Sequence, residues 1–418
     1  MRQLKKQDFT PPVVMTEDPP DVLWIKHGSS QFRHASWALF LAGFASFSLI
    51  YCVQPLLPEF PAEFGINPAT ASLALSLTTG TLAFAILLSG AFAQLFTRRR
   101  LMFTSMTLAA ICNLIAASTQ GWGWLLAARA LEGFMLGGVP AVAMAYLAEE
   151  IEPSSLGKAM GLYVGGTAFG SMAGRVGMGL VSAYTSWQVA MYALGAVCIL
   201  AAIGFVLLLP PSRNFRPQRM RLTAHLKIWR QHLQNPELLQ FYIIGAMLTS
   251  VFTTVFNYCA FRLVEPPYSL GRTAVSMIFL TFALGIFASS YGGALVDRFS
   301  RRIMLLVAFF TILAGIVLTF SSSIVVIVAG IAAITVGFFI GHSAASSGVG
   351  ANAGSAKSHA SALYLLFYYC GASITGWAGG WFWIHAGWPG IMAITSGCAL
   401  IGLIASLRRS GATKPRII

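Results

Sequence analysis

Four ionisable residues, Arg129, Glu132, Arg175 and His342, stand inside long apolar stretches of the sequence. An ionisable group in hydrocarbon costs about 2.5 to 3.5 kcal/mol on insertion scales, so such residues usually line a water-filled path. Arg129 and Glu132 are three residues apart and are therefore neighbours on one helix face. Glu132 is the deepest carboxylate and the first candidate for a proton carrier; His342, an imidazole, is the second. The alternatives are a static ion pair for Glu132 and a hydrogen-bonded packing role for His342.

Arg175 lies nine residues before Tyr184, where its apolar run ends, and would therefore stand about 13 Å inside a helix. We expect its side chain to face a central cavity. Other polar and aromatic residues in the runs are candidates for the same substrate cavity, with ordinary helix packing as the alternative for each. They are Tyr51, Gln54, Asn257, Tyr258, Tyr364 and Tyr368. Gly166, Gly170 and Gly174 form a stripe of small residues, which we expect to pack against the opposite half of the molecule.

The elements that must position these residues are membrane-spanning helices. The chain has 418 residues, of which 56% are hydrophobic and 10% are charged, whereas soluble domains carry about 25% charged residues. Twelve apolar runs of about 20 residues recur along the chain, and each can cross about 30 Å of hydrocarbon as a helix. The sequence therefore predicts an all-α, multi-pass membrane protein with twelve transmembrane helices.

The charge distribution predicts how these helices are oriented. Basic residues outnumber acidic ones by 14, which in a soluble protein would indicate nucleic acid as a partner. Here every Lys and Arg except Arg129, Arg175, Arg262 and Arg272 falls in a terminal tail or in an even-numbered loop. Because positive charge marks cytoplasmic loops, both termini are predicted to be cytoplasmic, and the partner of the basic loops is the lipid bilayer rather than nucleic acid.

The chain divides into two halves joined by a basic linker. The predicted segments are a disordered cytoplasmic tail at 1–34, six-helix bundles at 35–209 and 240–407, the linker at 210–239, and a cytoplasmic tail at 408–418. Within the linker, Leu222, Leu226, Trp229 and Leu233 recur at helical spacing. This pattern predicts an amphipathic helix on the membrane surface, with a flexible tether as the alternative.

The cysteines and the motif content argue against a metal or a cofactor. The six cysteines lie one each in six different runs, without a C-x-x-C pair. Free packing thiols are therefore expected rather than disulfides or a zinc site. The sequence contains no G-x-x-x-x-G-K-S/T loop, so we expect no cofactor and no direct use of ATP.

A glycine-and-arginine stretch closes the second run of each half. It reads GAFAQLFTRRR at 90–100 and GGALVDRFSRR at 292–302. An aspartate at the end of a helix can pair with an arginine or with the N-terminus of a neighbouring helix. The second copy has this aspartate, whereas the first has Gln94. The residues of the two copies that we assign to a candidate gate are Gly90, Arg98, Arg99, Gly293, Asp297, Arg298, Arg301 and Arg302.

With these motifs the chain resembles the major facilitator superfamily, over about residues 36–407. Within that family it is similar to the drug:proton antiporter-like branch of bacterial inner membrane transporters. The other matching stretches are YCVQPLLP at 51–58, RALEG at 129–133, GTAFGSMAGR at 166–175 and FFIGHSAASSGVG at 338–350. The family's span-five motif has Gly-Pro where this chain has Gly170-Ser171. The two glycine-and-arginine stretches correspond to the family's loop motif, which implies a cytoplasmic gate.

The resemblance implies two six-helix bundles that rock about a midplane site. It implies a monomeric, proton-coupled exporter of small molecules in the bacterial inner membrane, with drug-like, sugar-like or organic-acid substrates. Proton-coupled uptake and uniport of a metabolite remain the alternatives. An intramembrane enzyme is disfavoured, because the adjacent His342 and Ser343 diverge by about 100° around a helix. A receptor role is disfavoured because the predicted loops are short.

Overall fold

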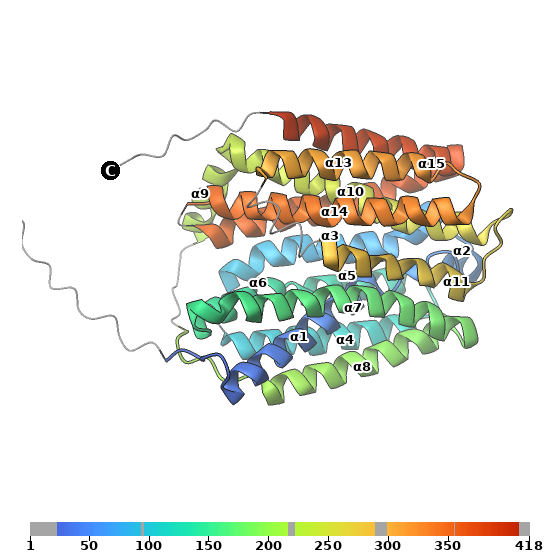
Figure 1. The fold of residues 1–418 in the computed structure, drawn as a ribbon. Coiled ribbons are helices and arrows are strands. Elements are labelled where there is room, and N and C mark those ends of the chain that lie inside the picture. Colours follow the sequence, from blue (N-terminus) through green and yellow to red (C-terminus); the bar gives the residue numbers. More distant parts are fainter. Residues whose placement is uncertain (1–22, 93–95, 216–221, 289–298, 355, 409–418) are drawn as a thin grey trace, which may run out of the picture.

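The computed structural model describes residues 23–92, 96–215, 222–288, 299–354 and 356–408. The described residues are almost entirely helical, and their long helices run side by side in one elongated body (Figure 1). Within these ranges, nine helices are long and apolar enough to cross a membrane. Many large apolar side chains, among them Leu200, Leu207 and Val317, lie exposed on the outer surface. Such a surface suits hydrocarbon rather than water.

The first half of the molecule contains helices α1 to α8. Their bounds are α1 Ser30–Tyr51, η1 Gln54–Leu56, α2 Phe60–Phe64, α3 Pro68–Phe92, α4 Arg98–Ser118, α5 Trp122–Leu136, α6 Pro140–Glu150, η2 Pro153–Ser155, α7 Leu156–Tyr184 and α8 Trp187–Leu208. The hydroxyl of Ser29 accepts a hydrogen bond from the backbone N–H of Phe32 and so caps α1. Pro140 occupies the first position of α6, which separates α6 from α5.

The second half contains helices α10 to α15 and is preceded by α9. The bounds are α9 Leu222–Gln234, α10 Pro236–Val264, α11 Arg272–Met277, η3 Ile278–Thr281, α13 Arg301–Leu318, α14 Ile324–Asn352 and α15 Lys357–Leu407. Asn235 caps α10 through its side-chain oxygen. The 51-residue α15 is interrupted at Gly387, whose φ of 58° lies in the left-handed region that favours glycine. It therefore consists of two helices joined by a sharp turn.

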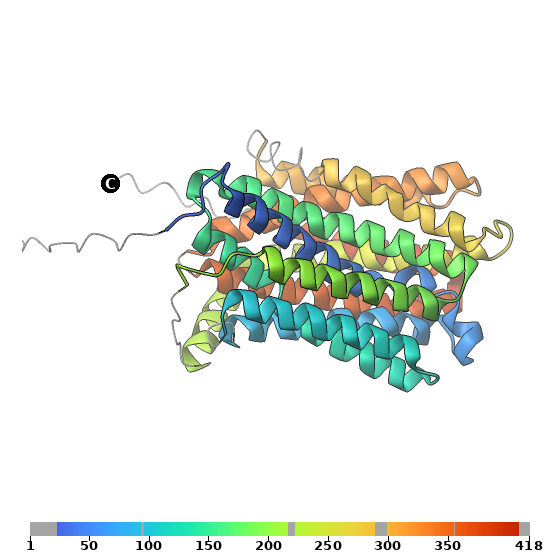
Figure 2. The ribbon, with the colours of Figure 1, turned by 90° about the horizontal axis from the view of Figure 1, so that it is seen from below.

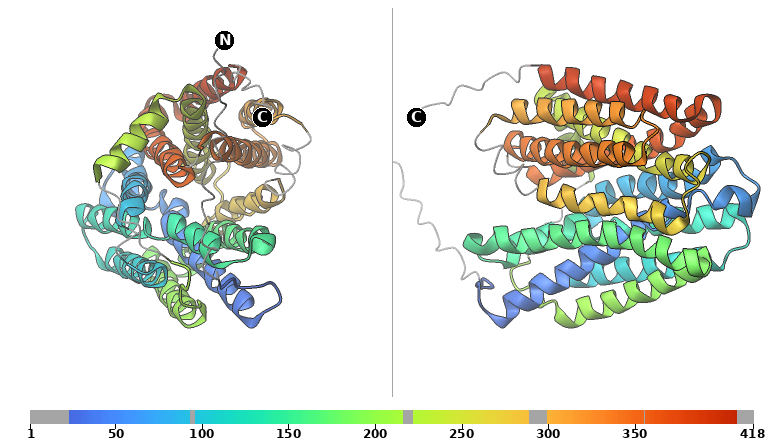
Figure 3. Two further views of the ribbon diagram at one scale, coloured as in Figure 1. Left: turned by 90° about the vertical axis from the view of Figure 1, so that its left-hand side faces the viewer. Right: turned by 45° about the vertical axis from the view of Figure 1, so that its right-hand side comes forward.

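The two halves lie side by side. Helices α1 to α8 gather on one side of the molecule and α10 to α15 on the other (Figure 3). Helix α1 begins and α15 ends at the end where α9 lies, whereas α2 and the start of α11 lie at the opposite end (Figures 1 and 2). We call these the α9 end and the α2 end.

The glycine stripe of α7 packs within the first half, so our prediction of its partner is wrong. A Cβ atom built on Gly166 or Gly170 would stand 2.4 or 2.3 Å from the carbonyl oxygen of Phe40 or Phe44 of α1. The backbones of α1 and α7 are therefore in direct contact, which only glycine permits. Small residues predict such an approach, but they do not identify the helix that approaches.

Helix α9 forms within the predicted linker. Leu226 and Leu233 are exposed, but Trp229 is buried, and its ring lies near His225 and His359. His225 is also buried and meets His359 of α15 at 2.9 Å between ring nitrogens. Part of the predicted apolar face thus packs against the second half.

Candidate functional site

Arg129 and Glu132 form a fully buried ion pair on α5. The Nη1 atom of Arg129 donates to Oε2 of Glu132 at 2.6 Å, and both side chains are 0% exposed. The second carboxylate oxygen, Oε1, has no hydrogen-bond partner. A buried carboxylate with one unused oxygen can take up a proton or accept a hydrogen bond from another donor.

The same arginine joins α5 to the end of α1. It donates to the carbonyl oxygens of Leu49 at 3.1 Å and Ile50 at 2.9 Å, and to that of Ala74 in α3 at 3.3 Å. The last carbonyls of a helix have no partner within that helix, and α1 ends at Tyr51. Arg129 therefore has a structural task in addition to its ion pair.

A second polar group connects the two halves. The Nε atom of Arg175 in α7 donates to Oε1 of Gln54 at 2.5 Å, and Nε2 of Gln54 donates to Oδ1 of Asn257 at 2.7 Å. Arg175 also donates to the carbonyl oxygen of Ser171 at 2.7 Å. Gln54 belongs to η1 and Asn257 to α10, so this chain of hydrogen bonds crosses from the first half into the second.

Aromatic rings from both halves enclose Arg175. The Cζ atom of its guanidinium is 4.0 Å from the ring centre of Tyr51, 4.5 Å from that of Phe282 and 5.5 Å from that of Phe279. Tyr51 belongs to the first half, whereas the two phenylalanines come from the second. Cation–π contacts of this kind are strongest where water is excluded, and Arg175 is only 1% exposed.

His342 lies in a third group, which aromatic residues of α14 and α15 form around it. The hydroxyl of Tyr364 and Nδ1 of His342 are 2.9 Å apart, and the imidazole stacks on Phe338 with 5.9 Å between ring centres. The ring of Tyr368 is 5.1 Å from it. Tyr258, by contrast, donates to the carbonyl oxygen of Gly376 and joins α10 to α15.

The α2 end carries an ion pair between the halves that we did not predict. Oε1 of Glu59 lies 3.4 Å from Nε of Arg272, and Nη1 of Arg272 donates to the carbonyl oxygen of Ser182 at 3.0 Å. Burial raises the pKa of Glu59, and Arg272 opposes this by lowering it. Nothing in the sequence spacing indicates that these residues meet, because they are far apart in the chain.

Gly179 of α7 and Ser276 of α11 also meet at the α2 end. A Cβ atom on Gly179 would stand 2.4 Å from the Cβ of Ser276. The two halves are therefore in close contact there.

Residues of both halves line a cavity at the α9 end. A cavity of about 270 Å³ lies between residues of α3, α4 and α6 in the first half and residues of α9 and α15. Arg98 and Glu149 line it and form a bidentate ion pair, with Nη2 of Arg98 donating to Oε1 of Glu149 at 2.7 Å. His225 and His359 line the other side. We did not predict Glu149.

The other gate candidates are described only in part. Arg99 donates to the carbonyl oxygen of Val206, Arg302 donates to that of Leu407 at 2.9 Å, and Arg301 is exposed. Gly293, Asp297 and Arg298 lie outside the described residues, and the burial of Gly90 is not described. The gate assignment therefore stays a prediction.

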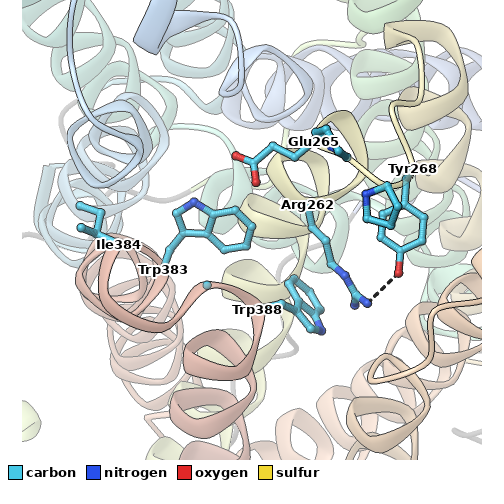
Figure 4. A pocket seen from close by; sticks show the side chains of 9 residues that line it. Arg262, Glu265, Tyr268, Trp383, Ile384 and Trp388 are labelled. Carbon is cyan, nitrogen blue, oxygen red and sulfur yellow. Dashed lines mark hydrogen bonds between the residues drawn. The ribbon is translucent and has the colours of Figure 1, made fainter.

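A separate pocket of about 480 Å³ opens at the tip of the second half (Figure 4). Trp383 and Trp388 line it together with Arg262, whose Nη2 donates to the hydroxyl of Tyr268 at 3.0 Å. Arg262 also donates to the carbonyl oxygens of Thr319 and Ser321. All these residues belong to the second half, so this pocket does not lie between the halves.

Helices with apolar outer surfaces, and buried polar groups where two halves meet, define a multi-pass membrane protein of the transporter class. The model of the Major Facilitator Superfamily matches residues 39–356, and the chain belongs to this family. It is 41% identical over 380 residues to "Uncharacterized MFS-type transporter YybF" of Bacillus subtilis (strain 168), covering 91% of this chain and 94% of the relative. It is 38% identical over 385 residues to "Inner membrane transport protein YnfM" of Escherichia coli (strain K12), covering 92% of each.

Solved transporters share the fold. The nucleoside transporter NupG superposes with a TM-score of 0.74 at 13% identity, covering 89% of this chain and 98% of NupG. A bacterial homolog of the human lysosomal transporter Spinster, in an inward-facing and occupied conformation, gives a TM-score of 0.71 at 14% identity, covering 90% and 96%. These likenesses concern the fold alone. The relatives are transporters, so the chain is a transporter rather than an enzyme.

Proposed function

We propose that the protein is a proton-coupled exporter of small molecules that works by alternating access. The observation that carries this proposal is the buried chain of Arg175, Gln54 and Asn257, which connects the two halves. In alternating access, substrate binds between two bundles that open first to one side and then to the other. The contacts at the α2 end and the cavity at the α9 end correspond to one of these states.

The proposed topology has twelve transmembrane passes in two six-helix bundles, with both termini in the cytoplasm. The bundles are residues 35–209 and 240–407, and the monomer lies in a bacterial inner membrane. Three observations support this topology. The basic residues follow the positive-inside pattern, α15 is interrupted at Gly387, and YnfM is named as an inner membrane protein. In this orientation the α9 end is cytoplasmic, and the structure corresponds to an inward-facing state.

The proposed proton carrier is Glu132. Its unused Oε1 atom and its complete burial support this role, whereas the short bond to Arg129 is what a static pair would also show. His342 remains the second candidate. A membrane potential of about 100 mV is worth about 2.3 kcal/mol per charge, and about 1.4 kcal/mol corresponds to tenfold. One proton could therefore sustain a solute gradient of about 40-fold.

Proteoliposomes test the proposal directly. Purified full-length protein would be reconstituted, a pH gradient imposed, and the movement of a panel of labelled small molecules measured. We expect at least one solute to be moved uphill, in the direction opposite to the protons. Movement with the protons would identify uptake instead, and exchange that ignores the pH gradient would identify a uniporter.

A further inference from the structure

Arg175 stands out among the buried charged residues because it lacks a counter-ion. Five charged side chains are buried in the described ranges, and four of them have a group of opposite charge nearby; for Glu150 this group is Arg213. Arg98 pairs with Glu149, Arg129 pairs with Glu132, and Glu150 accepts backbone N–H groups of the chain after α8. Arg175 has only neutral partners in the part of the chain that the structure describes. Burying a charge without a counter-ion costs desolvation free energy. A negatively charged group bound at this site would therefore be stabilised.

The hydrogen bonds of Arg175 also fix the orientation of the two amides beside it. A guanidinium can only donate, so Gln54 must present its oxygen to Arg175 and its Nε2 group to Asn257. Asn257 must then accept with Oδ1, which leaves its Nδ2 group as a donor. That group is buried and has no partner. The orientation follows from the arginine and does not depend on distinguishing oxygen from nitrogen.

Unused donors therefore stand at both ends of this series of hydrogen bonds, which runs from Arg175 through Gln54 to Asn257. Nη2 of Arg175 makes no hydrogen bond within the described residues, at one end, and Nδ2 of Asn257 makes none at the other. The hydroxyl of Ser76 in α3 is likewise buried and unpartnered. A Cβ atom built on Gly376 of α15 would stand 3.1 Å from Nδ2 of Asn257 and 3.2 Å from Oγ of Ser76. These distances are shorter than ordinary contact, so both groups lie directly against the backbone of Gly376.

We infer that this site binds an anionic, acceptor-rich solute of the carboxylate class, with Arg175 as the charge-recognising group. The carboxylate would supply the missing negative charge and accept from Nη2 of Arg175, and a further acceptor of the solute would accept from Nδ2 of Asn257. Rings of Tyr51 and Phe282 beside the guanidinium suit an apolar or aromatic body attached to the carboxylate. This inference rests on the proposed transport function, because it makes this site the place where substrate binds.

A purely structural role for Arg175 gives a different expectation. The residue would then only hold α7 against η1, and the charge of an added solute would not matter. Comparing solutes that differ in charge alone distinguishes the two roles.

The test uses thermal shift and titration calorimetry on the purified full-length protein. The probes are two scaffolds, benzyl and 4-phenylbutyl, each prepared as carboxylate, alcohol and amine. We expect the carboxylates to raise the melting temperature and to bind at least about 10-fold more tightly than the matched alcohols and amines. Arg175→Gln should abolish that preference. Arg33→Gln, which removes the same charge from an exposed position on α1, should preserve it.

Gly376→Ala provides a second variant that leaves every charge in place. Its methyl group would stand 3.1 Å from Nδ2 of Asn257 and 3.2 Å from Oγ of Ser76 and would displace them, so carboxylate binding should weaken even if Arg175→Gln does not fold. The inference is overturned if no carboxylate binds, if amines bind as tightly, or if Arg175→Gln binds carboxylates normally. Transport is scored separately in proteoliposomes. Uphill export of amines would refute the anion site but not the transport function. Carboxylate binding without movement of any solute would refute the transport function but not the anion site.

Discussion

Gly179→Ala tests whether the contact at the α2 end must close during transport. The added Cβ would stand 1.5 Å from Oγ and 2.4 Å from Cβ of Ser276, across the boundary between the halves. The hydroxyl can rotate away, but the Cβ of Ser276 cannot. Ordinary contacts begin at 3.4 Å, so α7 and α11 must separate by about 1 Å at this point. Such overpacking costs typically about 1 to 3 kcal/mol, which corresponds to a shift of about 5- to 150-fold away from the closed state.

The chain offers a matched control and a matched rescue for this substitution. Gly177 lies on the same helix with nothing within 4 Å of its added Cβ, so Gly177→Ala should behave like the native protein. The double variant Gly179→Ala/Ser276→Gly removes the obstructing Cβ, and the next nearest atom, Cβ of Pro55, is at an ordinary 3.7 Å. The double variant should therefore recover the transport rate of the native protein.

The assay is a distance measurement between spin labels at two exposed positions near the α2 end, Tyr184 in the first half and Val264 in the second. Gly179→Ala should lengthen this distance and slow transport, whereas Gly177→Ala should change neither. The reasoning is refuted if Gly177→Ala has the same effect, or if the double variant is as impaired as the single one.

Three further outcomes are expected. Glu132→Gln should abolish uphill, proton-driven movement in proteoliposomes and preserve downhill exchange; continued accumulation under a pH gradient would exclude Glu132 as the carrier. Because burial raises the pKa of Glu59 more than Arg272 lowers it, the closed α2 end binds a proton more tightly than an open one. Closure is then most favoured below about pH 4.3 and loses this contribution as pH rises through the raised pKa, and Glu59→Gln should remove this dependence from the label distance. Asp297→Asn should impair transport more than Gln94→Ala, since only the former removes a charge; equal losses in vesicle transport would contradict this.

Local spacing predicted the groups that share one helix. The three-residue separation of Arg129 and Glu132 predicted that they are neighbours, and the structure pairs them at 2.6 Å. The depth of Arg175 in its apolar run predicted that it lies well inside a helix, and its side chain is buried, whereas its facing a central cavity stays a prediction. These properties depend on the period of a helix and on hydropathy, both of which can be read along one segment.

Contacts between segments could not be predicted in this way. The glycine stripe of α7 faces α1 rather than the other half, and Arg98 pairs with Glu149, which lies outside both motif stretches. The ion pair of Glu59 with Arg272 joins residues from different halves. Each of these depends on which helices pack together and how each is rotated about its axis, which hydropathy does not specify because lipid and protein interiors are equally apolar.

The sequence by itself determined that this chain is a helical membrane protein with charges buried inside its helices, and it predicted two related halves. Its composition, the length of its apolar runs and the placement of its basic residues each carry that information locally. The tertiary structure alone decided that Gln54 connects Arg175 to Asn257 and leaves donors unused at both ends. Such a chain exists only once three helices, distant in sequence, bring their side chains within hydrogen-bonding distance, and its direction is fixed because a guanidinium can donate but cannot accept.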